Sequence, residues 1–225
     1  MILLVIFDMA GTAINEDNLV YKTILTTLRD YEIQTDLKTV LEHCAGKEKK
    51  AAIRDVIVEI SKDNPPETLV EEMHSAFKKK LSIIYETAEM EVFPSVKKVI
   101  ESLKRRDIKV SFNTGYTREV AEQILKNVDI EVGKDIDVLM TASDVSNSRP
   151  APDMINEICN RLDIPANLVI KIGDSAVDIQ EGKNAKVKYS IGITTGAQNR
   201  TQMQKANPDF IIDDMLQLLP IIGGN

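Results

Sequence analysis

The sequence has few cysteines and no excess of basic residues. Its two cysteines, Cys44 and Cys159, form no CxxC motif and no His/Cys spacing typical of a metal site, so we expect both to be reduced core residues. The formal net charge is −7 over 225 residues. This balance argues against nucleic acid as a partner, because phosphate backbones attract basic surfaces, but it does not exclude a small anionic substrate.

Long apolar runs are also missing. The apolar run at residues 2–7 stops at Asp8, and it has neither the basic start nor the length of a signal peptide. No other segment approaches the roughly 20 apolar residues that span a bilayer. The sequence therefore predicts a cytoplasmic protein with no membrane partner. With 43% hydrophobic and 28% charged residues, it is typical of a globular protein with a substantial core.

Short apolar runs alternate with helical patterns through most of the chain. The run at residues 2–7 is typical of a buried parallel strand. Similar runs lie at residues 108–113, 168–173 and 188–193, and weaker ones at residues 137–140 and 209–212. Apolar residues at helical spacing lie between these runs, as at Val96, Val99, Ile100 and Leu103. This alternation predicts βαβ units and a doubly wound parallel α/β sheet.

Residues 16–91 interrupt this alternation. They contain no convincing strand, and Pro65 and Pro66 separate two of the helices that the pattern predicts. The expected apolar helix faces are Val20, Ile24 and Leu28, then Ile53, Val56, Ile57 and Ile60, then Val70, Met73, Phe77, Leu81 and Ile84. We therefore expect an all-helical cap at residues 16–91, inserted into an α/β core formed by residues 1–15 and 92–225. Hinges near residues 15 and 91 would let the cap close.

Polar clusters follow four of the predicted strands. They are DMAGT at residues 8–12, Thr114-Gly115, RPAPD at residues 149–153 and GDSAVD at residues 173–178. Each cluster alone is explained by a helix N-cap or a turn. However, the carboxyl ends of parallel strands meet at one edge, where α/β sheets bind ligands. Carboxylates that converge there would repel one another unless a cation or an arginine lies among them.

That arrangement suits phosphoryl transfer. Asp8 can attack phosphorus and form an aspartyl-phosphate. A divalent ion held by oxygens can neutralise the developing charge, with Asp174 as its second carboxylate. Asp178 lies one helical turn further on and could hold the metal ligands in place. The Thr114 hydroxyl and the Arg149 guanidinium can bind the phosphoryl oxygens.

The order of the motifs DxxGT, hhhT-G, R-P-x-P and GDSxxD resembles the haloacid dehalogenase superfamily over the whole chain. Within it, the chain is most similar to the phosphonoacetaldehyde hydrolases, or phosphonatases, which share Ala10 where most superfamily phosphatases have a second Asp. The resemblance implies a Rossmann-like core with a helical cap. It implies Mg²⁺ bound by Asp8, the Ala10 carbonyl oxygen and Asp174, with Asp178 beside them. Substrate contacts are implied for Thr12, Gly46, Thr114, Gly115 and Arg149.

Ala10 cannot protonate a leaving group as a general acid. Phosphonatases instead use a cap lysine that forms a Schiff base with the substrate aldehyde, and the resemblance places that lysine at Lys49. Independently, Lys49 lies four residues before Ile53, on the apolar stripe of its helix. Burial and the helix N-terminus should lower its pKa and favour the free amine, whereas a surface lysine with a solvated amine is the alternative. Phosphonatases carry Met and His at the positions of Ala45 and Ala52, so we expect a roomier pocket here.

Together these features predict a magnesium-dependent hydrolase that cleaves the carbon–phosphorus bond of a 2-oxoalkylphosphonate such as phosphonoacetaldehyde. One alternative is a phosphomonoesterase that acts on a small ester, such as a sugar phosphate, with the same scaffold. Another alternative is a non-catalytic domain that binds a phosphate ligand or regulates a partner. The resemblance to phosphonatases also implies a homodimer formed through the cap.

Overall fold

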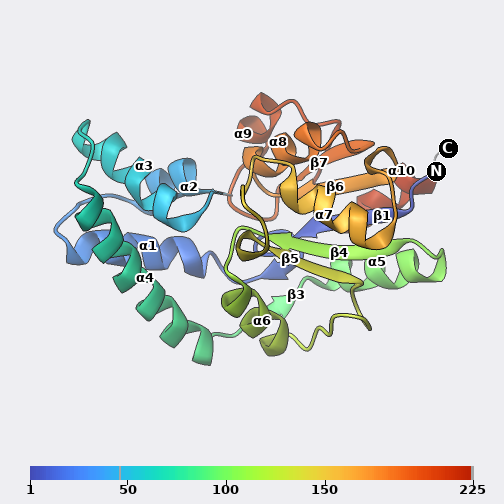
Figure 1. Ribbon diagram of the computed structural model, residues 1–225, viewed down its shortest axis with the longest axis horizontal. Helices are drawn as coiled ribbons and strands as arrows, with labels where there is room; N and C mark the ends of the chain where they lie inside the picture. Colours follow the sequence, from blue (N-terminus) through green and yellow to red (C-terminus); the bar gives the residue numbers. More distant parts are fainter. Residues whose placement is uncertain (46, 224–225) are drawn as a thin grey trace.

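The computed structural model describes residues 1–45 and 47–223. Its centre is a six-stranded sheet of order β5-β4-β1-β6-β7-β8, in which all neighbouring strands are parallel (Figure 1). The strands are β1 (Leu4–Asp8), β4 (Lys109–Thr114), β5 (Val138–Thr141), β6 (Val169–Gly173), β7 (Tyr189–Ile193) and β8 (Phe210–Ile212). Each lies in or overlaps one of the predicted runs, which confirms the doubly wound α/β sheet.

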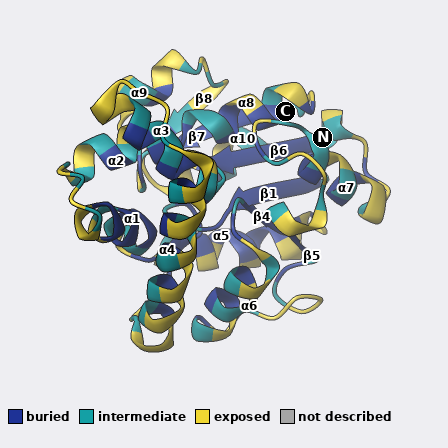
Figure 2. Cartoon of the chain, turned by 60° about the vertical axis from the view of Figure 1, so that its left-hand side comes forward, coloured by how far each residue is buried: buried dark blue, intermediate teal, exposed yellow. Residues whose placement is uncertain are grey.

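Helices cover both faces of this sheet. They are α5 (Pro94–Arg105), α6 (Arg118–Asn127), α7 (Asp153–Leu162), α8 (Ala176–Asn184), α9 (Arg200–Lys205) and α10 (Leu218–Gly223). Side chains alternate along β1, so that Leu4 and Ile6 share an apolar cluster with α7, whereas Val5 and Phe7 share another with α5 and α6. The strands are therefore largely buried from both sides, as Figure 2 shows, except the edge strand β8, where Phe210 is exposed.

Four further helices stand beyond the carboxyl ends of the strands, on the side opposite the N-terminus (Figure 1). They are α1 (Leu19–Asp30), α2 (Leu37–Cys44), α3 (Lys49–Ser61) and α4 (Glu67–Thr87). The chain leaves and re-enters the sheet region through a short antiparallel ribbon of β2 (Ile14–Asn15) and β3 (Glu91–Val92). The expected cap boundaries at residues 15 and 91 lie on this ribbon, although the division into two domains stays a prediction.

The helical segment differs from the sequence-based expectation in three places. Helix α2 was not predicted as a separate element. Ile60 is 38% exposed because it lies beside the end of α3 and away from the packed face. On α4 the buried stripe reaches Tyr85 instead of Ile84, because successive steps of four residues follow Met73 along one side of the helix. Among the described helices, none is long and apolar enough to cross a membrane.

Candidate active site

Polar side chains from four segments converge at the carboxyl edge of the sheet. Asp8 ends β1, Thr114 ends β4, Asp174 follows β6, and Arg149 lies between β5 and α7. Carboxylate oxygens of Asp8, Asp174 and Asp178 lie within 4.8 Å of one another, and all three side chains are buried. The structure thus brings together the three carboxylates that the sequence analysis expected to meet.

A small chamber of about 20 Å³ lies against this edge. It is lined by Asp8, Ala10, Tyr21, Lys49, Thr114, Gly115, Tyr116, Arg149 and Asp174. Thr12, expected to contact the substrate, is not part of this lining, and its buried hydroxyl has no hydrogen-bond partner in the described part of the chain. Gly46, also expected to contact the substrate, lies outside the described residues. The chamber therefore joins the nucleophile candidate to the lysine of the helical segment.

Gly11 allows the loop after β1 to approach Asp174. Its φ is +78°, in the left-handed region that favours glycine. A Cβ atom at this position would lie 2.5 Å from the Oδ2 atom of Asp174. Any other residue would therefore combine backbone strain with a collision against a carboxylate of the site.

Arg149 binds several groups of the site at once. Its Nη1 atom donates to Oδ1 of Asp8 at 2.7 Å and lies 2.9 Å from Oδ1 of Asp178. Its Nη2 atom donates to the backbone oxygen and the Oδ1 atom of Asn113, and its Nε atom lies 3.0 Å from Glu181. These contacts hold the buried guanidinium in one orientation, beside the carboxylate that would attack phosphorus.

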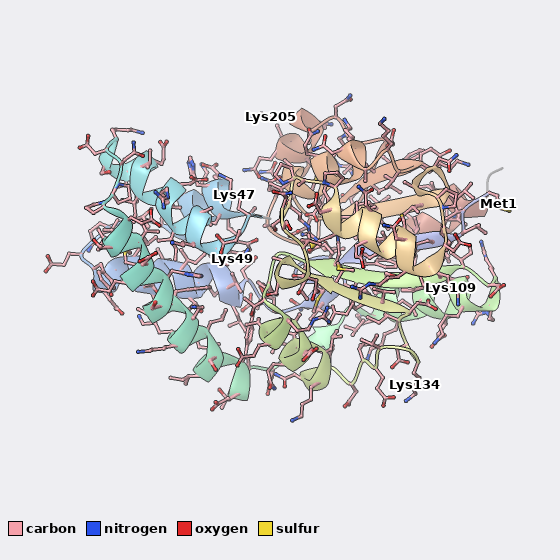
Figure 3. The ribbon with its side chains drawn as sticks, in the orientation of Figure 1. Met1, Lys47, Lys49, Lys109, Lys134 and Lys205 are labelled. Atoms are coloured by element: carbon pink, nitrogen blue, oxygen red, sulfur yellow. The ribbon has the colours of Figure 1, made fainter. Side chains whose placement is uncertain are left out.

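Lys49 begins α3 and lies where helices α1–α4 meet the sheet, as Figure 3 shows. Its side chain is buried, and its Nζ atom donates to the backbone oxygen of Lys47 at 2.7 Å. The same atom lies 5.6 Å from the ring centroid of Tyr21 and 5.4 Å from that of Tyr116. Burial lowers the pKa of Lys49, which is the direction that the sequence analysis expected. By contrast, the neighbouring Lys50 forms exposed ion pairs on the outside of the helix.

The family model for haloacid dehalogenase-like hydrolases matches residues 5–193 of this chain. That span contains the nucleophile candidate, the arginine, both further aspartates and the whole helical segment. The chain belongs to the haloacid dehalogenase-like hydrolases. It is therefore an enzyme of the hydrolase class, which agrees with the sequence-based resemblance and speaks against the non-catalytic alternative.

This haloacid dehalogenase-like hydrolase is similar in sequence to proteins with two different names. "Pyrophosphatase PpaX" of Bacillus cereus is 28% identical over 219 residues, which is 97% of this chain and 95% of that protein. A phosphonoacetaldehyde hydrolase of Bacillus cereus is 31% identical over 205 residues, or 86% of this chain and 76% of that protein. A second one is 36% identical, but the aligned part spans 50% of its length.

Solved structures share the fold of this hydrolase. A phosphonoacetaldehyde hydrolase-like protein from Oleispira antarctica superposes with a TM-score of 0.84. The alignment covers 99% of this chain and 92% of that one at 21% sequence identity. At this identity the likeness concerns the architecture of the sheet and the helical segment.

The charge of the site is suited to a divalent cation. Four buried carboxylates, those of Asp8, Asp174, Asp178 and Glu181, face two buried cations, Arg149 and Lys171. When these six groups are ionised, the carboxylates exceed the two cations by two negative charges. Burial, together with repulsion from Asp8 and Asp178, raises the pKa of Asp174 well above its usual range. The excess of carboxylate oxygens fits a hard cation such as Mg²⁺.

The three aspartates differ in what they already contact. Arg149 and Lys171 surround Oδ1 of Asp178, and Ser175 donates to its Oδ2 atom at 2.5 Å. Despite burial, these contacts lower the pKa of Asp178. Asp174 instead accepts one backbone hydrogen bond, from Ala197 at 2.6 Å. Asp8 and Asp174 are therefore the carboxylates best placed to take a cation, with Asp178 orienting the basic groups.

Several polar residues of the site were not assigned a role from the sequence. Lys171 lies in the middle of β6 and is fully buried, with its Nζ atom 2.9 Å from Asp178 and 2.7 Å from Oδ1 of Asn113. The Asn113 amide in turn donates to Glu181 at 2.9 Å. A lysine inside an otherwise apolar strand is itself a sequence signal, because a buried charge needs a partner. No comparable signal marks the backbone N–H of Ala197.

Glu16 was also missed, because it lies between polar residues that resemble an exposed loop. Its side chain is 3% exposed, and the Tyr85 hydroxyl donates to it at 2.7 Å. Burial raises the pKa of Glu16 to about 7. Tyr116, which lies beside Lys49, shares this buried cluster. A titratable carboxyl therefore lies at the junction of the sheet and the helical segment.

Proposed function

We propose that this hydrolase cleaves the carbon–phosphorus bond of a 2-oxoalkylphosphonate, with Asp8 as the nucleophile and Lys49 as the Schiff-base lysine. The observation that carries the proposal is the position of the Lys49 amine, which lines the same small chamber as the Asp8 carboxylate. Burial lowers the pKa of Lys49, which favours the free amine that attacks a carbonyl carbon. The adjoining Ala10 carries no group that could protonate a leaving alcohol.

The phosphoryl half of the reaction uses the carboxyl edge of the sheet. An Asp8 oxygen attacks phosphorus and forms an aspartyl-phosphate, which water then hydrolyses to release inorganic phosphate. Arg149, already hydrogen-bonded to Asp8, balances the charge on the phosphoryl oxygens together with the Thr114 hydroxyl. Asp8, the Ala10 carbonyl oxygen and Asp174 would hold Mg²⁺, which supplies further positive charge when bound.

The carbonyl half of the reaction uses Lys49. Its amine adds to the substrate carbonyl carbon, and loss of one water gives a protonated imine. As the carbon–phosphorus bond breaks, its electron pair moves into the carbon skeleton and forms an enamine, while phosphorus bonds to Asp8. The enamine takes up a proton at carbon, and a second water releases the ketone or aldehyde from Lys49. With the water that cleaves the aspartyl-phosphate, one water is consumed in total.

We also propose that residues 16–91 act as a cap over a core formed by residues 1–15 and 92–225. Lys49 belongs to the helical segment, whereas Asp8 belongs to the sheet. The distance between Lys49 and Asp8 during the reaction is therefore set by how the helical segment meets the sheet. The β2–β3 ribbon is the covalent connection between these two parts. Closure would exclude water from the imine and from the aspartyl-phosphate.

Hydrolysis of a phosphate ester or anhydride is the second candidate function. It is favoured by the relative named pyrophosphatase, which aligns along 97% of this chain. If the protein has this function, Lys49 is a structural residue, and hydrolysis of the phosphate ester or anhydride would survive its replacement. The alanine at position 10 counts against the ester, because an alkoxide leaving group needs a proton.

The deciding experiment measures magnesium-dependent phosphate release from phosphonoacetaldehyde by the wild type and by Lys49→Arg. Arginine keeps the positive charge but forms no imine, so we expect the variant to lose activity. Lys50→Arg is the matched control, because this neighbour pairs with exposed glutamates and should retain the wild-type rate. Borohydride added during turnover should attach the substrate skeleton to Lys49, detected by peptide mass. Equal cleavage of a phosphate ester by all three proteins, without phosphonate cleavage, would refute the proposal.

A further inference from the structure

A second, larger cavity adjoins the small chamber. Its volume is about 350 Å³, and it lies between α4, α6 and the loop after β4. Lys49, Gly115 and Tyr116 line both cavities. The larger one is many times the roughly 10–15 Å³ that accommodates one water. It therefore offers room for part of a ligand whose reacting end lies in the small chamber.

Apolar side chains from two helices line this larger cavity, together with polar and charged ones that include Glu48, His74, Lys78, Glu86 and Glu119. Phe77 and Leu81 of α4 face it from one side, and Val120 of α6 faces it from the other. Val120 is only partly buried where it packs at the edge of the core, whereas its neighbour Ala121 is fully buried. The side chain of Val120 is thus available to a ligand. A substrate with only an aldehyde hydrogen on the carbonyl carbon at Lys49 would leave the space beside these apolar side chains unfilled.

We propose that the larger cavity is a tail pocket, which binds an apolar substituent on the carbonyl carbon of the substrate. This inference rests on the proposed function and narrows its substrate class to ketones of the form R–CO–CH₂–PO₃²⁻, in which R is an aliphatic chain or an aromatic group. The phosphoryl group would lie at Asp8 and Arg149, the carbonyl carbon at Lys49, and R beyond Lys49 between α4 and α6.

The chemistry balances with one water. Lys49 and the ketone form a protonated imine and release water, and Asp8 takes the phosphoryl group as the carbon–phosphorus pair becomes an enamine. The CH₂ carbon then takes up a proton and becomes a methyl group. Hydrolysis of the imine and of the aspartyl-phosphate gives the methyl ketone R–CO–CH₃ and inorganic phosphate. The tail R is unchanged throughout, so its contribution is to binding and orientation.

The test compares phosphate release from phosphonoacetaldehyde, 2-oxopropylphosphonate and 2-oxoheptylphosphonate in the presence of Mg²⁺. A single methylene in a fitting apolar pocket changes kcat/KM by about ten-fold or more. We therefore expect kcat/KM for 2-oxoheptylphosphonate (the heptyl compound) to be at least ten-fold higher than that for 2-oxopropylphosphonate (the propyl compound). A heptyl compound that is no better than the propyl compound would overturn the tail pocket while leaving the proposed function intact. Absence of phosphate release from all three phosphonates would overturn both.

Two neighbouring tryptophan variants on α4 test the location of the pocket. Ser82 lines the cavity and is solvent-exposed, so Ser82→Trp should fold normally and fill part of the pocket. Ile83 is 65% exposed and does not line the cavity, so Ile83→Trp is the matched control. We expect Ser82→Trp to reduce the heptyl-to-propyl ratio of kcat/KM at least ten-fold, and Ile83→Trp to leave this ratio unchanged. Equal ratios in both variants would place the tail elsewhere and overturn the assignment.

Discussion

Glu16 should make the fold less stable as the pH rises from about 4.5 to about 7. Its carboxyl group is buried and accepts a hydrogen bond from Tyr85, and the nearby cation Lys49 offsets only part of the cost of burying its charge. Burial raises its pKa to about 7 from an ordinary value of 4.5. The folded protein therefore holds this proton over a pH range in which the unfolded chain releases it.

The sign and the size of the pH effect on stability follow from the difference between the Glu16 pKa values in the folded and unfolded states. Below pH 4.5 the carboxyl is protonated in both states, so that it contributes no pH dependence. Between 4.5 and about 7 the unfolded state binds fewer protons, and the free energy of unfolding falls as the pH rises. At about 1.4 kcal/mol per unit, the difference between the two pKa values corresponds to a loss of about 3 kcal/mol. Above pH 7 this contribution levels off.

Urea unfolding of the wild type and of Glu16→Gln, between pH 4.5 and pH 8 at constant Mg²⁺, would measure this contribution. Glutamine keeps an oxygen that can accept from Tyr85 but does not ionise, so its curve should lack the loss of about 3 kcal/mol. Glu89→Gln removes an exposed carboxylate and controls for the change in net charge. Parallel curves for the wild type and Glu16→Gln would refute the reasoning, because Glu16 would then ionise alike in both states.

Three further predictions concern the carboxyl edge of the sheet. Lys171→Met should destabilise the fold by about 3–5 kcal/mol in urea unfolding, because it removes a buried cation from Asp178 and Glu181; a loss below about 1 kcal/mol would contradict the pairing. Mg²⁺ at 100 times its Kd should raise the stability of the wild type by about 2.7 kcal/mol in thermal unfolding, and Asp174→Asn should remove this gain. An equal gain in the variant would place the ion elsewhere. Gly11→Ala should lower kcat at least ten-fold at saturating substrate, since its Cβ atom would collide with Asp174; wild-type kcat would show that the loop can move aside.

Local patterns in the sequence were sufficient to predict the strands of the sheet. Residues 4–8 form β1 because a continuous apolar run that ends at an aspartate can be buried on both faces and still present a polar group at its end. The same reasoning located the strands before Thr114 and Asp174. Convergence of the catalytic candidates then followed from topology alone, because parallel strands end at one edge.

The prediction of buried helix faces was less reliable where the apolar pattern was ambiguous. Periodicity correctly assigned Val20, Ile24 and Leu28 of α1 to the buried face. It failed at the end of α4, where Ile84 is only partly buried and Tyr85 is buried. Hydrophobicity favoured the isoleucine, but the tyrosine can be buried because its hydroxyl donates a hydrogen bond to Glu16. Such a partner, 69 residues away, cannot be found from local spacing.

What the sequence by itself determined was the position of each strand along the chain and the identity of the polar residues at the strand ends, because these depend on neighbours within a few positions. Lys49 was singled out by the resemblance to the phosphonatases, and its place at the start of an apolar helical stripe supported that choice. Only the tertiary structure decided that Lys49 faces Asp8, that Glu16 is buried, and that a cavity of about 350 Å³ lies beyond them. These properties depend on how α1, α3, α4 and α6 meet the sheet, and burial and the protonation of a carboxyl are set by that packing.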